Sequence, residues 1–141
     1  MSQPIGRLYS EVRANEQLPE LTIELTPTRI VATAIATRDY QPVHHDIDIA
    51  QGFGNAGIFL NTHTTAGILE RFVLEWAGSG AFVKSVKFRL GIPGYAGDTL
   101  VLRGEVAEMN EDERLVSVKV VGTNALGTHV DGAVVIELAN A

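Results

Sequence analysis

The feature that most constrains this sequence is one long helical segment followed by four strand-like segments joined by short turns. Between Ile58 and Trp76 apolar residues recur every three or four positions without a proline, which predicts a helix with one apolar face. Apolar and polar residues then alternate, as in strands with one buried face, at about residues 85–90, 99–109, 116–120 and 128–138. Consecutive strands with links of hairpin length predict an antiparallel sheet.

The helix has to bury its apolar face, and the concave face of that sheet is the surface available. A shorter strand at residues 20–25 and a helix from residue 26 to about 37, ending before Pro42, precede it. We therefore predict an α+β hotdog fold, an antiparallel sheet wrapped around one long central helix, with residues 1–141 as a single domain. Such a sheet leaves an edge strand unpaired, so we expect a dimer or a larger assembly.

Composition excludes several classes of protein. The chain has 141 residues, no cysteine and a net charge of -6, so disulfide scaffolds, thiolate zinc sites and cysteine nucleophiles are ruled out. We expect a cytoplasmic protein with neither nucleic acid nor membrane as its partner. An anionic ligand would need a local basic patch. Lys84, Lys87 and Arg89 form the most basic stretch, although an exposed strand face has the same appearance.

The segment from Asp39 to Asp46 places a carboxylate five residues before the imidazole of His44, in a loop that Pro42 stiffens. Such a pair suits proton transfer, because the carboxylate binds a water or orients the ring while imidazole titrates near neutral pH. A solvated turn with a local hydrogen bond is the alternative reading. A metal site built from His44, His45, Asp46 and Asp39 lacks a His-x-x-x-His helical spacing, and we predict no metal.

The remaining histidines and glycines suit structural roles. We expect His45 to be exposed, His63 to be a hydrogen-bonded structural residue of the long helix, and His129 to lie at the surface. Gly57, with the nearby Gly52 and Gly54, precedes the predicted helix. Its backbone N–H would suit an oxyanion hole, and a flexible turn before a helix explains the same glycines.

The run Asp39–Asp46 resembles the hydratase motif of MaoC-like (R)-specific enoyl-CoA hydratases, Asp-x-Asn-Pro-[Leu/Ile]-His-x-Asp. Pro93–Leu100 resembles the family's Pro-Val-x-x-Gly-Asp-Thr-Leu turn, and Asn124–Gly127 resembles its later Asn-Gln-x-Gly turn. The fuller run Ala36–Asp46, together with Ile58–Asn61 and Tyr95–Thr99, is more similar still to the small MaoC-like subunits of bacterial steroid side-chain enoyl-CoA hydratases. The likeness spans about residues 20–138.

This resemblance implies that Asp39 and His44 jointly hold the water that adds to the enoyl double bond, with Asp39 as the base. In the family a His-Gly pair at the start of the long helix supplies the oxyanion N–H, and Gly57 stands near that point here. Three departures change the support of the loop: Gln41 replaces asparagine, Arg38 replaces glycine, and the His-Gly pair is missing.

The function that the resemblance implies is hydration of a bulky 2-enoyl-CoA, of the steroid side-chain type, without a metal or redox cofactor. The family also implies an acyl-CoA substrate and a heteromer with a larger MaoC-like subunit. Three alternatives stay open. They are a homodimeric hydratase or dehydratase for ordinary fatty enoyl-CoA, a non-catalytic acyl-CoA-binding subunit of a heteromer, and a hotdog thioesterase.

Overall fold

The sheet contains five antiparallel strands in the order β1-β3-β4-β5-β2. The computed structural model describes residues 6–140, so the ends of the predicted domain, residues 1–5 and 141, lie outside it. The strands are β1 (Leu21–Glu24), β2 (Phe82–Leu90), β3 (Thr99–Asn110), β4 (Leu115–Asn124) and β5 (Gly127–Glu137). The predicted antiparallel sheet is confirmed, and β2 pairs with β5 at its edge rather than with β3, the next strand in sequence.

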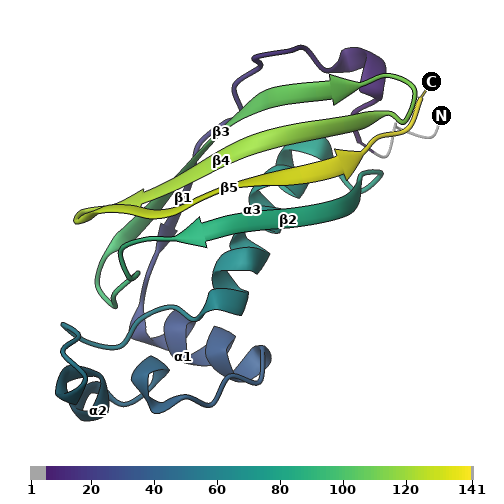
Figure 1. Cartoon of the computed structure of the whole chain (residues 1–141). Helices are drawn as coiled ribbons and strands as arrows, with labels where there is room; N and C mark the ends of the chain where they lie inside the picture. The colour runs from purple at the N-terminus through teal and green to yellow at the C-terminus, as the bar shows by residue number, and fades with distance from the viewer. Residues whose placement is uncertain (1–5, 141) are drawn as a thin grey trace.

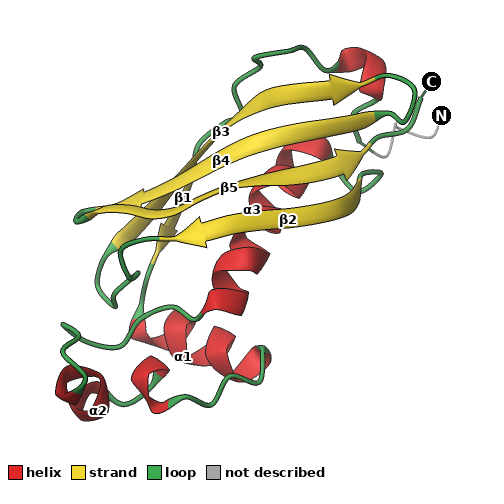
Figure 2. Cartoon of the chain, in the orientation of Figure 1, coloured by secondary structure: helices red, strands yellow, loops and turns green. Residues whose placement is uncertain are grey.

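The long helix α3 (Thr62–Ala77) lies against one face of the sheet (Figure 1). Two shorter helices, α1 (Pro27–Ala36) and α2 (Ile47–Gly52), gather at the end of the molecule where α3 begins (Figure 2). Single 3-10 turns, η1 (Tyr9–Glu11) and η2 (Pro42–His44), complete the described elements. Within residues 6–140 no helix is long and apolar enough to cross a membrane.

Packing of α3 on the sheet explains where the core lies. Leu69, Phe72 and Val73 of α3 are almost fully buried, and so are the inward-facing valines of β4 and β5. The Phe72 ring lies over Gly104 of β3, where an added Cβ would come within 2.6 Å of the ring. A side chain at Gly104 would displace α3, so this glycine sets how closely the helix approaches. The predicted α+β hotdog arrangement is confirmed.

The predicted start of the long helix was wrong by four residues. Residues 58–60 are extended because they pair with the chain around Tyr95. Leu60 N–H donates to the Gly94 carbonyl at 3.0 Å, and Ala96 N–H donates to the Ile58 carbonyl at 3.0 Å. The helix begins only after Asn61, whose side chain caps it. Helix α2 was not predicted, and its N-cap is the Asp46 carboxylate, which accepts from Ile49 N–H at 3.1 Å.

The prediction that His129 lies at the surface was wrong. Its ring is 3% exposed and sits between β5 and α3. Nδ1 lies 2.7 Å from the Ile92 carbonyl and therefore donates, so Nε2 accepts from the Thr65 hydroxyl at 2.9 Å. The ladder shifts here, since Gly122 of β4 pairs with Val130 and the next residue pairs with Thr128. His129 is thus the extra residue of a bulge, which turns it inward.

Burial of His129 makes the stability of the fold sensitive to acid. Desolvation lowers the pKa of His129, outweighing the hydrogen bond to Ile92. Below about pH 6.5 the unfolded chain takes up a proton at this ring more readily than the folded chain does. Stability therefore falls as the pH drops through this range.

We predict that His129→Asn lowers the free energy of unfolding at pH 7.5 by about 1–3 kcal/mol, because Thr65 and the Ile92 carbonyl lose their partner. The variant should also lose less stability between pH 7.5 and pH 5.5 than the parent protein does. Urea unfolding at both pH values measures this, with exposed His45→Asn as the matched control. An equally steep loss in His129→Asn would show that other groups cause the acid sensitivity.

Candidate active site

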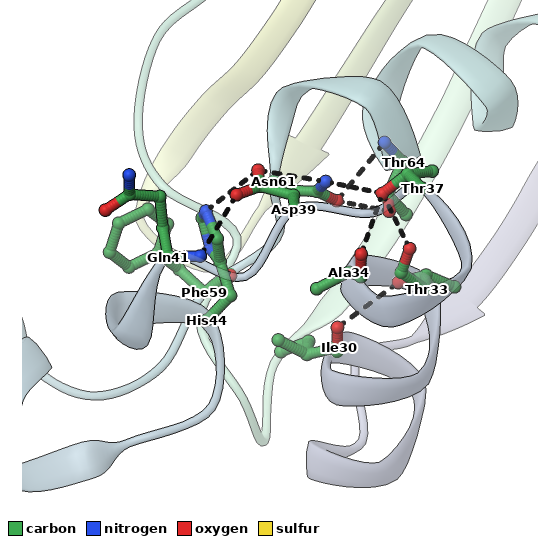
Figure 3. A network of polar contacts seen from close by, with 10 residues as sticks. All are labelled: Ile30, Thr33, Ala34, Thr37, Asp39, Gln41, His44, Phe59, Asn61 and Thr64. Carbon is green, nitrogen blue, oxygen red and sulfur yellow. Dashed lines mark hydrogen bonds and ion pairs between the residues drawn. The ribbon is translucent and has the colours of Figure 1, made fainter.

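Asp39 and His44 face each other across a tight turn that follows α1 (Figure 3). Arg38 adopts a left-handed φ of 56°, and Asp39 N–H donates to the Ala34 carbonyl at 2.9 Å, which reverses the chain at the end of the helix. Pro42 then begins η2, and this turn carries His44 back toward Asp39. His44 Nε2 lies 3.4 Å from Asp39 Oδ2. The sequence spacing therefore places both groups at one point in the structure.

A backbone carbonyl fixes the protonation pattern of His44. Its Nδ1 lies 2.7 Å from the Phe59 carbonyl oxygen, which can only accept, so Nδ1 carries a hydrogen. In the neutral ring Nε2 is then an acceptor, and it faces a carboxylate that is also an acceptor. The ring is 7% exposed and packs edge-on against the Phe59 ring, with centroids 5.0 Å apart. A donor with two hydrogens, such as water, satisfies both acceptors at once.

The carboxylate of Asp39 is held in its ionised form. Its Oδ1 accepts from Gln41 N–H at 3.3 Å, and its Oδ2 accepts from the Asn61 amide at 3.2 Å. Burial is the largest single influence and raises the pKa of Asp39. The hydrogen bonds from Gln41 and Asn61 act against it, as do the rings of His44 and His63 when they are protonated. The net result is a pKa below the ordinary value of an aspartate, which suits a base at neutral pH.

Asn61 is a site residue that the sequence reasoning missed. It is 1% exposed and lies where the end of α1, the start of α3 and Asp39 meet (Figure 3). Residues 61–65 are all polar, and they fall inside the helix that we predicted from Ile58 to Trp76. Asparagine is a preferred N-cap residue, and its position just ahead of the apolar repeat is the signal that could have identified a helix start there.

Gly57 does not occupy the position for which we singled it out. It is half-buried in the loop before α3 and lines a separate pocket with residues that include His45 and Tyr95. Because α3 begins at Thr62, the backbone N–H groups at its start belong to Thr62 and His63. Within the described part of the chain neither N–H has a protein acceptor, whereas the next two, from Thr64 and Thr65, bond to Asn61.

The other histidines divide clearly. The expected exposure of His45 is confirmed. His63 is exposed rather than a hydrogen-bonded structural residue, because the later helix start places it in the first turn of α3, where its charge reaches Asp39. Among residues 6–140 no three His, Asp or Glu side chains gather in a way that could hold a metal ion.

An apolar groove of about 330 Å³ borders this network. It lies between β1, α1 and α3, and its walls include Ile23, Ala36, Thr37, Thr64 and Ile68. Thr37 and Thr64 both contact Asn61, which also contacts Asp39, so the groove reaches the edge of this network although Asp39 and His44 do not line it.

Three basic side chains, those of Arg29, His63 and Arg71, also line the groove. The basic stretch that sequence analysis identified lies instead on β2, where Lys84 pairs with Glu137 at 3.1 Å. The cationic groups beside the candidate site are therefore contributed by α1 and α3.

The chain is similar to several known proteins. The 3-oxo-4,17-pregnadiene-20-carboxyl-CoA hydratase beta subunit of Mycobacterium tuberculosis is 49% identical over 121 residues, covering 86% of this chain and 92% of that protein. The crystal structure of the ChsH1-ChsH2 complex from the same organism contains a chain with a TM-score of 0.87 and 47% identity, covering 89% of this chain and 98% of that one.

More distant structures share the fold. The R-hydratase PhaJ1 of Pseudomonas aeruginosa superposes with a TM-score of 0.87 at 20% identity, covering 96% of this chain and 88% of that one. A family model described as the MaoC-like domain matches residues 11–127. This chain belongs to the MaoC-like domain family.

Proposed function

We propose that this chain supplies the catalytic pair of an enoyl-CoA hydratase, with Asp39 and His44 binding the water that is added. The observation that carries the proposal is the distance of 3.4 Å between Asp39 Oδ2 and His44 Nε2, which both accept hydrogen bonds while the ring is neutral. A water molecule that lies to one side of both atoms can donate one hydrogen to each and direct its oxygen lone pairs away from them. That oxygen is then placed to attack the β-carbon of a bound enoyl thioester.

The proton movements follow from this arrangement. As the water oxygen bonds to the β-carbon, one O–H bond breaks and Asp39 takes the proton, while the electron pair of the double bond moves toward the thioester oxygen. The proton passes to Nε2 of His44 and from there to the α-carbon as the carbonyl re-forms. Water is thereby added across the double bond and both side chains return to their initial states. The family resemblance favours the (R)-3-hydroxyacyl product.

Negative charge on the thioester oxygen requires hydrogen-bond donors in place before the reaction. We assign this role to the backbone N–H groups of Thr62 and His63 instead of Gly57. They lie at the positive end of α3, have no protein acceptor within the described residues, and directly follow Asn61, which touches Asp39.

A bulky, steroid-like acyl-CoA is the substrate class that we propose. The relative at 49% identity is named as a hydratase of a pregnadiene carboxyl-CoA. The groove that borders the network is lined mainly by apolar atoms, as a fused-ring acyl group requires. Arg29 offers positive charge to the phosphates of CoA, beside Arg71, which also binds Glu75 at 2.7 Å.

We also propose that the chain works as one subunit of a heteromer with a larger MaoC-like protein. The relative is named a beta subunit, and the similar solved chain belongs to a two-protein complex. A groove that is open on one side is consistent with a second subunit that completes it.

Asp39→Asn and His44→Ala should each lower kcat for hydration by about 10²–10⁴-fold, because each removes one proton-transfer group. The assay follows loss of the enoyl thioester absorbance by the assembled protein. His45→Ala changes the exposed neighbouring histidine and should stay within about twofold of the parent. If hydration survives both changes unaltered, the chain is a non-catalytic binding subunit.

A steroid side-chain enoyl-CoA should be hydrated with a higher kcat/KM than crotonyl-CoA, because burial of the ring system in an apolar groove adds binding energy. Parallel assays on the two substrates measure the ratio, and a thiol reagent detects free CoA. Activity on crotonyl-CoA alone would contradict the steroid assignment. Stoichiometric release of CoA without hydration would identify a thioesterase.

Expression together with the proteins of its natural source should yield a complex of this chain with a larger MaoC-like polypeptide. Affinity capture of this chain followed by mass determination of the intact complex tests the expectation. A mass of twice the chain's 15.2 kDa would instead identify a homodimer.

A further inference from the structure

We propose that Asn61 is a positioning residue for the hydration reaction, whose side-chain amide orients the Asp39 carboxylate toward Nε2 of His44. The inference rests on the proposed function, in which Asp39 is the base. It adds a role for a residue on a different element from the catalytic pair, and it explains how the active-site loop is supported where the usual motif residues are absent.

The orientation of the Asn61 amide is fixed by its acceptor side. Its Oδ1 accepts from the backbone N–H of Thr64 at 3.3 Å and also from the Thr64 hydroxyl. A backbone N–H can only donate, so the amide oxygen has to face Thr64. The amide nitrogen is thereby directed to the other side, toward Thr37 and Asp39.

The donor side of Asn61 is equally saturated. Nδ2 lies 2.8 Å from the Thr37 hydroxyl oxygen and 3.2 Å from Asp39 Oδ2. The Thr37 hydroxyl donates its own hydrogen to the Thr33 carbonyl at 2.8 Å, so its oxygen is left to accept from Asn61. A buried amide whose donors and acceptors are all engaged has no alternative orientation.

The contact determines how the Asp39 carboxylate is held. Gln41 N–H binds Oδ1 and Asn61 binds Oδ2, so each oxygen has one fixed donor and the plane of the group is set. The remaining lone pair of Oδ2 is then available for the water that His44 also contacts. Without Asn61 the carboxylate keeps only the 3.3 Å bond from the Gln41 backbone and can rotate about its χ angles.

Asn61 also relates the base to the proposed oxyanion donors. The same side chain caps α3 and thereby sets where the Thr62 and His63 N–H groups lie. The Asn61 amide therefore fixes the position of Asp39 relative to the two N–H groups that we assign to the thioester oxygen. Displacement of either partner by about 1 Å is enough to slow a reaction of this kind severely.

Asn61→Asp separates the positioning role from the structural role. Aspartate is as good an N-cap as asparagine, so Thr64 keeps its acceptor. The second oxygen, however, places a negative charge against Asp39 in place of a donor. The other titratable groups close to Asp39, His44 and His63, remain unchanged.

We expect Asn61→Asp to lower kcat at pH 7 by at least about tenfold while KM changes by less than about threefold. The acid limb of the kcat/KM profile should move to higher pH, because the new carboxylate raises the pKa of Asp39 and less of the base is ionised at a given pH. Asn61→Ser removes the donor without adding charge and should give a smaller loss of kcat and a smaller shift of the acid limb.

Thr26→Asp is the matched control. Thr26 caps α1 by accepting from Arg29 N–H at 3.1 Å, so aspartate adds the same charge at an N-cap of another helix. This variant should retain kcat and the parent pH profile within about twofold. Urea unfolding of all variants shows whether they fold, and if Asn61→Asp does not fold, Asn61→Ser decides the question by the same kcat and pH readouts.

An unshifted acid limb and an unchanged kcat in a folded Asn61→Asp or Asn61→Ser would overturn the positioning role. In that case, loss of activity in Asp39→Asn and His44→Ala would still support the proposed hydratase function. If those two variants are active as well, the proposed function itself has failed, and the two failures are thereby distinguished.

Discussion

Backbone N–H groups at the start of a buried helix need partners, and this requirement organises the catalytic end of the molecule. Helix α3 buries its apolar face against the sheet, so its first turn lies close to the core. Asn61 satisfies the Thr64 N–H there and, with its remaining donors, reaches Thr37 at the end of α1 and Asp39 in the following turn. The side chain of Asn61 therefore both caps α3 and supports the Asp39 carboxylate.

Periodicity in the sequence identified the elements that packing determines, and missed those that pairing and capping determine. The apolar repeat of α3 and the alternation in β3, β4 and β5 each report one buried face, and the structure has these elements. Residues 58–60 show no such pattern, because their extended form comes from hydrogen bonds to Gly94 and Ala96. The inward turn of His129 likewise depends on a shift in the β4–β5 ladder, which alternation along one strand cannot reveal.

The Asp39–His44 pair was visible in the sequence because a five-residue spacing around Pro42 is short enough for one turn to close. The protonation pattern of His44 could not be predicted from the sequence, since Phe59 lies fifteen residues away and acts through its carbonyl. The glycine that the family pattern leads one to expect before the aspartate is replaced by Arg38, yet the left-handed φ is retained. Hydrogen bonds from Arg38 and Asp39 to the last turn of α1 hold the turn in that conformation.

Two anchors of the catalytic pair are main-chain atoms, the carbonyl of Phe59 and the N–H of Gln41. Every residue type provides that carbonyl, and every type except proline provides that N–H, so no ordinary replacement of either side chain removes the anchor. The hydrogen bonds at these two positions therefore do not depend on side-chain type, although the Phe59 ring also packs against His44. The Gln41 position can accept a residue that the motif does not contain. Exact residue identity matters only for the few side chains whose chemical groups the peptide backbone cannot supply.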